Sequence, residues 1–135
     1  MDKMKKLITR LEEKDASLVV LYRNDKIKEY YNKRVIDIVN IIKMDKNALS
    51  GACVADKIIG KTAASLLAIS GVIEIYARKL SKFAIPVLEK YNVKYTYGEI
   101  IDYVINNDKT GMCPMENKFK DEENIQVIYD YFVNI

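Results

Sequence analysis

The stretch from Ser17 to Tyr31 reads SLVVLYRNDKIKEYY and holds two strand-like segments around a short polar turn. Residues 17–22 are almost entirely apolar, and residues 26–31 form a second strand-like run. Between them, Asn24 and Asp25 carry side chains that tolerate the positive φ of a tight hairpin turn. The stretch therefore predicts two antiparallel strands joined as a hairpin.

Helices are expected on both sides of this hairpin, because apolar residues recur there at intervals of three and four. Residues 3–14 place one apolar set on a single helix face, namely Met4, Leu7, Ile8 and Leu11. Residues 34–43 do the same with Val35, Ile38, Val39 and Ile42. Both patterns predict amphipathic helices.

The stretch from Gly51 to Gly71 reads GACVADKIIGKTAASLLAISG and predicts a central buried helix. Its larger apolar side chains share one side of a helix that begins near Asp56: Ile58, Ile59, Leu66 and Leu67. Gly71 suits the position just after the end of such a helix. Gly60 and the alanines would let this helix lie close against a sheet.

The C-terminal half predicts alternating strands and helices. Strands are expected at residues 72–77 and 93–97, and helices at 81–92, 98–105 and 121–133, with Pro86 shifting the start of the first helix toward residue 83. A turn is expected at residues 107–111. A hairpin that feeds two β-α-β crossovers implies an α/β domain over residues 1–135, with a mixed β-sheet sandwiched by helices.

Composition excludes several classes of function. The 22 basic and 19 acidic residues among 135 give a net charge of +3 and are interspersed, so a concentrated nucleic-acid-binding face is not indicated. The sequence contains neither a membrane-spanning apolar run nor a signal-type apolar core, so we expect a cytoplasmic protein with no membrane partner. It contains no histidine, which excludes imidazole chemistry. No cofactor is indicated.

The two cysteines, Cys53 and Cys113, are expected to be reduced thiols. Cys53 precedes the helix expected from Asp56, and Cys113 precedes Pro114, a residue suited to the first position of a helix. A helix N-terminus stabilises a thiolate, so either cysteine is a candidate nucleophile. The alternative is that each is a small buried apolar side chain.

Residues 55–62 form a relaxed match to a phosphate-binding loop, with Ala55 in place of the first glycine. The alternative interpretation is a helix that contains a close-packed glycine. Lys57 and Lys61 would lie one turn apart on that helix, beside Asp56, where two ammonium groups suit an anion such as phosphate. The alternative is that these charged residues form a solvated edge of the helix and bind no ligand. The polar segment from Asp108 to Glu116, which includes Thr110, is a second candidate site, and the alternative is a plain connecting loop.

The motifs GACVADKIIGKTAA at residues 51–64, Tyr97-Gly-Glu and Thr110-Gly-Met-Cys-Pro-Met-Glu116 resemble a small prokaryotic family of uncharacterised proteins with the cytidine deaminase-like fold. The resemblance implies a three-layer domain with the element order expected above. Zinc deaminases of that fold carry H-x-E or C-x-E at the helix after the hairpin and P-C-x-x-C at the next helix. At these two places we expect residues 53–58 and 81–84, which lack that ligand set.

The leading hypothesis is a deaminase-fold protein without the zinc site that binds a nucleotide or related phosphorylated ligand in the vestigial pocket. The lysines would hold phosphate, and Asp56 or Glu116 would bind a sugar hydroxyl or act as a base. The candidate ligand-binding residues are Cys53, Asp56, Lys57, Lys61, Thr110, Cys113 and Glu116. The alternatives are a metal-free enzyme that uses a low-pKa cysteine, with Glu116 as a further catalytic candidate, and a ligand-free interaction module, for which a homo-oligomer is an option.

Overall fold

The computed structural model describes residues 2–33 and 35–134. Its elements, in chain order, are α1 (Lys3–Glu13), β1 (Leu18–Leu21), β2 (Ile27–Tyr30), α2 (Ile36–Met44), β3 (Cys53–Ile59), α3 (Lys61–Ile69), β4 (Glu74–Ser81), α4 (Ile85–Lys90), β5 (Lys94–Ile101), α5 (Pro114–Phe119) and α6 (Ile125–Val133). The strands form one sheet in the order β2-β1-β3-β4-β5. Strand β1 is antiparallel to β2 and β3, whereas β3, β4 and β5 are parallel. The predicted α/β fold with a mixed sheet flanked by helices is confirmed.

The predicted hairpin is confirmed. Leu18 pairs with Tyr30 and Leu21 pairs with Ile27 across β1 and β2. Asp25 adopts a φ of 69°, and the backbone N–H of Tyr22 donates to the carbonyl of Lys26 at 2.8 Å. The turn forms because an aspartate at this position accepts the left-handed backbone conformation more readily than most residues.

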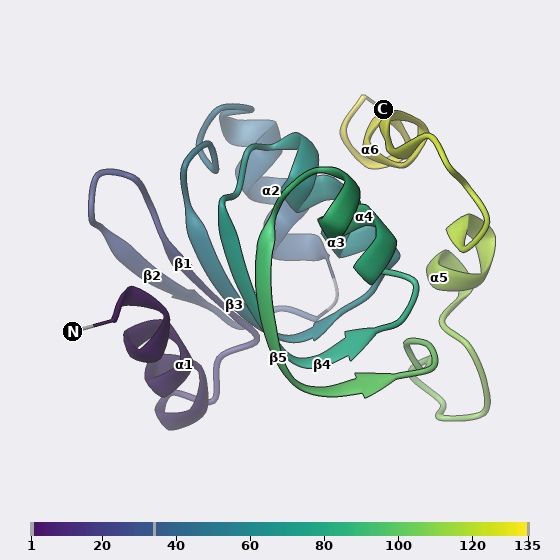
Figure 1. The fold of residues 1–135 in the computed structure, drawn as a ribbon, viewed down its shortest axis with the longest axis horizontal. Helices are drawn as coiled ribbons and strands as arrows, with labels where there is room; N and C mark the ends of the chain where they lie inside the picture. The colour runs from purple at the N-terminus through teal and green to yellow at the C-terminus, as the bar shows by residue number, and fades with distance from the viewer. Residues whose placement is uncertain (1, 34, 135) are drawn as a thin grey trace.

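Helices cover both faces of the sheet (Figure 1). On one face α1 buries Leu7 and Leu11 in a small cluster with Val19 and Ala55. On the other face α2, α3 and α4 lie over the larger core, and α6 packs against α3. Within the described chain, no helix combines the length and the apolarity that crossing a membrane requires.

Residues 53–59 form strand β3, so the helix predicted from Asp56 is wrong over this part. The strand lies between β1 and β4 and is buried on both faces over most of its length. Such strands read as continuous apolar runs, which periodicity alone does not separate from a buried helix. The helix begins only at Lys61, after Gly60 as its N-cap, and Gly71 follows its end with a φ of 89°, as predicted.

Other element boundaries also differ from the predictions, and α6 begins at Ile125 instead of residue 121. The helix predicted at residues 98–105 does not form, because β5 continues to Ile101, which pairs with Ser81 of β4. Ser81 accordingly ends a strand, and the helix predicted at residues 81–92 begins only at Ile85, with Pro86 in its first turn. Pairing with a neighbouring strand outweighs local helix propensity in both places. Helix α2 begins at Ile36; its predicted first residue, Arg34, lies outside the described residues.

Candidate functional site

A groove of about 560 Å³ lies at the carboxyl-terminal ends of β3 and β4. Ligands of α/β proteins commonly bind at this edge of a parallel sheet, and the volume lies within the range of small-molecule sites. The groove is lined by the start of α3, by α4 and the residues before it, and by the segment from α5 to α6: Lys61, Lys82, Phe83, Pro86, Val87, Lys90, Tyr91, Lys120, Asp121, Glu122, Glu123 and Ile125.

Lys61 is the first residue of α3 and is a buried residue of this lining. Its Nζ donates a hydrogen bond to the carbonyl oxygen of Lys120 at 2.9 Å. Burial lowers the pKa of the ammonium, and the nearby carboxylates of Asp121 and Glu122 oppose that shift. The side chain of Lys61 is therefore held by the segment between α5 and α6, which lines the same groove.

Glu116 lies directly against the start of α3, with a side chain that is only 2% exposed. One carboxylate oxygen, Oε1, accepts the backbone N–H of Lys61 at 2.7 Å, and Oε2 accepts the N–H of Val104 at 2.9 Å. A carboxylate at a helix N-terminus satisfies an otherwise unpaired N–H and interacts favourably with the helix dipole. Glu116 thus occupies the anion position that we expected a ligand phosphate to take.

Gly60 makes this contact sterically feasible. A Cβ atom at this position would lie 2.8 Å from Oε1 of Glu116 and 2.7 Å from Cγ2 of Val104. Real Cβ contacts are rarely so short, so a side chain at residue 60 would displace the carboxylate or the valine. The glycine belongs to a strand–helix junction and not, as predicted, to the body of a helix.

The two walls of the groove carry different side chains. The wall formed by α4 and the residues preceding it carries Lys82 and Lys90, together with the rings of Phe83 and Tyr91. The opposite wall carries the acidic run from Asp121 to Glu123. Lys82 also approaches Asp102 at 3.8 Å, a distance at which two exposed charges interact weakly. The groove therefore presents both signs of charge.

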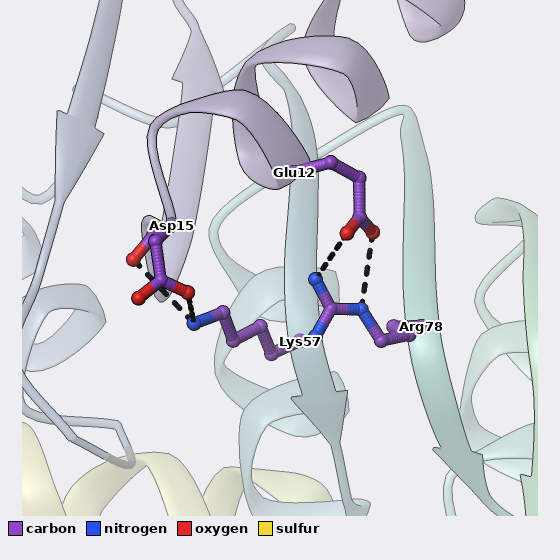
Figure 2. A network of polar contacts seen from close by, with 4 residues as sticks. All are labelled: Glu12, Asp15, Lys57 and Arg78. Atoms are coloured by element: carbon purple, nitrogen blue, oxygen red, sulfur yellow. Dashed lines mark hydrogen bonds and ion pairs between the residues drawn. The ribbon is translucent and has the colours of Figure 1, made fainter.

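Lys57 does not lie on the same helix face as Lys61, because the two residues belong to different elements. Lys57 belongs to β3, and its Nζ forms an ion pair with Asp15 Oδ1 at 2.6 Å (Figure 2). The prediction that the two lysines share a helix face is wrong. Figure 2 also shows Arg78 of β4 bound to Glu12 of α1, so this network connects α1 to the sheet rather than forming part of the groove.

Asp56 is buried within β3 and does not line the groove. Burial raises the pKa of its carboxyl group to about 7, and the charge of Asp37 in α2 adds to that increase. The backbone N–H of Ile58, which donates to Asp56 Oδ1 at 3.2 Å, opposes it. No pattern in the sequence indicated that this carboxyl group is buried, and Asp56 was predicted to lie at the start of a helix.

The two cysteines lie in different environments. Cys53 is the first residue of β3, where burial raises the pKa of its thiol and the charge of Glu74 adds to the effect. The prediction that it lies at a helix N-terminus is wrong. Cys113 is the N-cap of α5 and directly precedes Pro114, as predicted. Thr110 lies in an exposed turn, where its Oγ1 accepts a hydrogen bond from Asn106 at 3.1 Å.

Among the predicted binding residues, the structure brings Lys61 and Glu116 into contact. Lys82, Lys90 and Tyr91 of the groove were not predicted as site residues, since they are isolated residues in and beside α4 that form a lining only together with the α5–α6 linker. The binding roles proposed for Cys53, Asp56, Lys57, Thr110 and Cys113 stay predictions.

The family described as TM1506, domain of unknown function (DUF1893), matches residues 6–135 of the chain. The chain belongs to the DUF1893 family. The predicted membership of an uncharacterised family is therefore confirmed. Comparison with the curated proteins found no match.

The DUF1893 chain is similar to the crystal structure of a DUF1893 family protein, TM1506, from Thermotoga maritima. The two share 29% identity with a TM-score of 0.86, over 97% of this chain and 89% of that one. It is also similar, at 14% identity and a TM-score of 0.44, to a diaminohydroxyphosphoribosylaminopyrimidine deaminase/5-amino-6-(5-phosphoribosylamino)uracil reductase from the same organism. That likeness covers 86% of this chain and 39% of the other, and it carries no argument about activity.

The residues expected at the two motif places do not begin helices in this DUF1893 chain. Residues 53–58 belong to β3, and residues 81–84 are the end of β4 and the turn before α4. In residues 2–33 and 35–134, no three His, Cys, Asp or Glu side chains come together in a group that could hold a metal ion.

Proposed function

We propose that the groove between α3, α4 and the α5–α6 linker binds a small phosphorylated ligand of the nucleotide type. The observation that carries this proposal is the presence of four lysines in one groove at the carboxyl-terminal edge of the parallel strands: Lys61, Lys82, Lys90 and Lys120. Ammonium groups are common partners of phosphate in proteins. The proposal concerns binding and assigns no reaction.

The lysines differ in what they offer a phosphate. Lys61 uses one of its three N–H donors on the carbonyl of Lys120, which leaves two for a ligand. Lys82 and Lys90 extend from the α4 side and add charge without a buried partner. The N-terminus of α3 contributes less than we expected, because the carboxylate of Glu116 already accepts the N–H of Lys61.

The remaining lining suits the other parts of a nucleotide. Phe83 and Tyr91 are aromatic residues of the lining, and the Nζ atoms of Lys82 and Lys90 lie over their rings at 5.7 and 5.8 Å from the centroids. A base would stack on these rings once a phosphate has drawn the ammonium groups away, and such stacking tolerates any base identity. The carboxylates from Asp121 to Glu123 are acceptors for the hydroxyl groups of a sugar. This division supports a ligand with an anionic end and a donor-rich end over a plain inorganic anion.

Isothermal titration with ADP, AMP, adenosine and inorganic phosphate tests the proposal. We expect ADP to bind more tightly than adenosine, and Lys82→Ala and Lys90→Ala to weaken ADP binding. Lys46→Ala is the matched control, because Lys46 is an exposed lysine in the loop after α2 and does not line the groove. Equal loss of affinity in Lys46→Ala, or no heat with any of the four compounds, would contradict the proposal.

The alternative of a low-pKa cysteine finds no support at Cys53, since burial raises the pKa of that thiol. Cys113 keeps the predicted position at the start of α5, but α5 has only six residues, a short element for a helix dipole. We therefore place ligand binding ahead of covalent catalysis. An interaction module without a ligand is the outcome that a silent titration would favour.

A further inference from the structure

Lys61 is held at two atoms by the segment that follows β5. Its backbone N–H donates to Glu116, and its Nζ donates to the carbonyl of Lys120. We propose that Glu116 is a positioning residue for the groove: it fixes α5 against the first turn of α3 and thereby places the wall formed by residues 120–123. This inference rests on the proposed function, because it concerns the affinity of the same groove.

The burial of Glu116 assigns it to positioning rather than to ligand contact. The side chain is 2% exposed, does not line the groove, and uses both oxygens on backbone N–H groups. These donors belong to different elements, since Lys61 begins α3 and Val104 follows β5. One carboxylate therefore joins α3, α5 and the chain after β5, through charge-assisted hydrogen bonds that are stronger than neutral ones.

The wall depends on this contact because Lys120 follows α5 immediately. Between Glu116 and Lys120 lies Phe119, which is buried and packs edge-on against Tyr131 of α6 at a centroid distance of 5.3 Å. The aromatic contact holds α5 to α6, whereas Glu116 supplies the polar contact that holds it to α3. Without the carboxylate we expect the segment to stay packed on α6 while the wall shifts relative to Lys61.

The experiment compares Glu116→Gln and Glu116→Ala with Leu7→Ala. Leu7 is a fully buried residue of α1 on the opposite face of the sheet, so its truncation lowers stability without touching the groove. Two readouts are needed: amide hydrogen exchange at Lys61 and Val104, and the dissociation constant of ADP measured at a temperature at which every variant is folded.

We expect both amides to exchange faster in Glu116→Ala, and ADP to bind about fivefold more weakly, the ratio that one lost net hydrogen bond produces. Glu116→Gln should lie between wild type and Glu116→Ala, because the amide oxygen accepts one N–H while its NH₂ group faces the other donor. Leu7→Ala should bind ADP with the wild-type affinity. Its amides at Lys61 and Val104 should exchange no faster than its lower global stability accounts for.

Three results would overturn the inference: unchanged exchange at both amides in Glu116→Ala, unchanged ADP affinity despite faster exchange, or an equal loss of affinity in Leu7→Ala. If Glu116→Ala does not fold, the same criteria apply to Glu116→Gln. A wild-type protein that does not bind ADP contradicts the proposed function instead. In that case the exchange rates still decide the positioning role, since they require no ligand.

Discussion

The Oε1 atom of Glu116 lies 2.7 Å from the backbone nitrogen of Lys61, 55 residues away in the sequence. The contact joins α5 to the start of α3, together with the hydrogen bond from Lys61 Nζ to the carbonyl of Lys120 and the packing of α6 on α3. It also explains why residue 60 is a glycine, since a Cβ there would enter the space of the carboxylate. The stability of this junction is open to direct measurement.

Replacement of Gly60 by alanine should destabilise the protein by about 1–3 kcal/mol, the usual range for forcing extra atoms into a packed site. The new Cβ would meet Val104 and Glu116 at under 3 Å. The measurement is the free energy of unfolding in urea. Gly111→Ala is the matched control, because nothing lies within 4 Å of a Cβ at residue 111, and it should be nearly neutral. Comparable losses in both variants would show that the junction is not tightly packed.

The buried carboxyl group of Asp56 should make stability depend on pH. Its pKa is about 7 in the folded protein, above the ordinary value of 3.8, so the folded state binds this proton more tightly than the unfolded state does. The contribution is therefore most favourable below about pH 4 and is lost as the pH rises through 7, with a slope approaching about 1.4 kcal/mol per pH unit. The free energy of unfolding of wild type and of Asp56→Asn, measured between pH 4 and 8, separates this contribution from others. The free energy of the asparagine variant should not show the decrease with rising pH that Asp56 causes. A wild-type slope that survives in the variant would assign the effect to another group.

Cys53 should react slowly with iodoacetamide at pH 7.5. Burial raises the pKa of its thiol and also restricts access of the reagent. Mass spectrometry of the alkylated peptides, with Cys113→Ser as background, gives the rate at this one position. Labelling as fast as that of a free cysteine would reopen the hypothesis of a reactive thiol in β3.

The ion pair between Arg78 and Glu12 should add only about 0.5 kcal/mol to stability. Its geometry is bidentate, with contacts of 2.6 and 3.0 Å, but both side chains are partly exposed. Exposed pairs gain little because water and salt screen them. A double-mutant cycle with Arg78→Met and Glu12→Gln measures the coupling, which should fall further in 1 M NaCl. A coupling above about 2 kcal/mol would mean that α1 is held mainly by charge, not by its buried leucines.

Local signals in the sequence were sufficient for the hairpin and for most of the helices. Asn24 and Asp25 mark a turn by their own backbone preferences, and the interval of three and four residues marks α1. The same kind of signal was misleading at residues 53–59. A strand buried on both faces has no alternating pattern, so Asp56 and Ile58 were assigned to the helix that starts only at Lys61.

The sequence by itself determined the α/β class, the hairpin, the absence of histidine and the family, because these depend on composition, on short-range backbone preferences and on motifs along the chain. Only the tertiary structure decided which charged residues meet. It separated Lys57 from Lys61 by placing them in a strand and a helix, and it joined Lys61 to Glu116 by folding α5 back onto α3. The physical reason is that a buried N–H or carboxylate takes whichever partner the packing of distant segments brings within hydrogen-bonding distance, and spacing along the chain does not encode that choice.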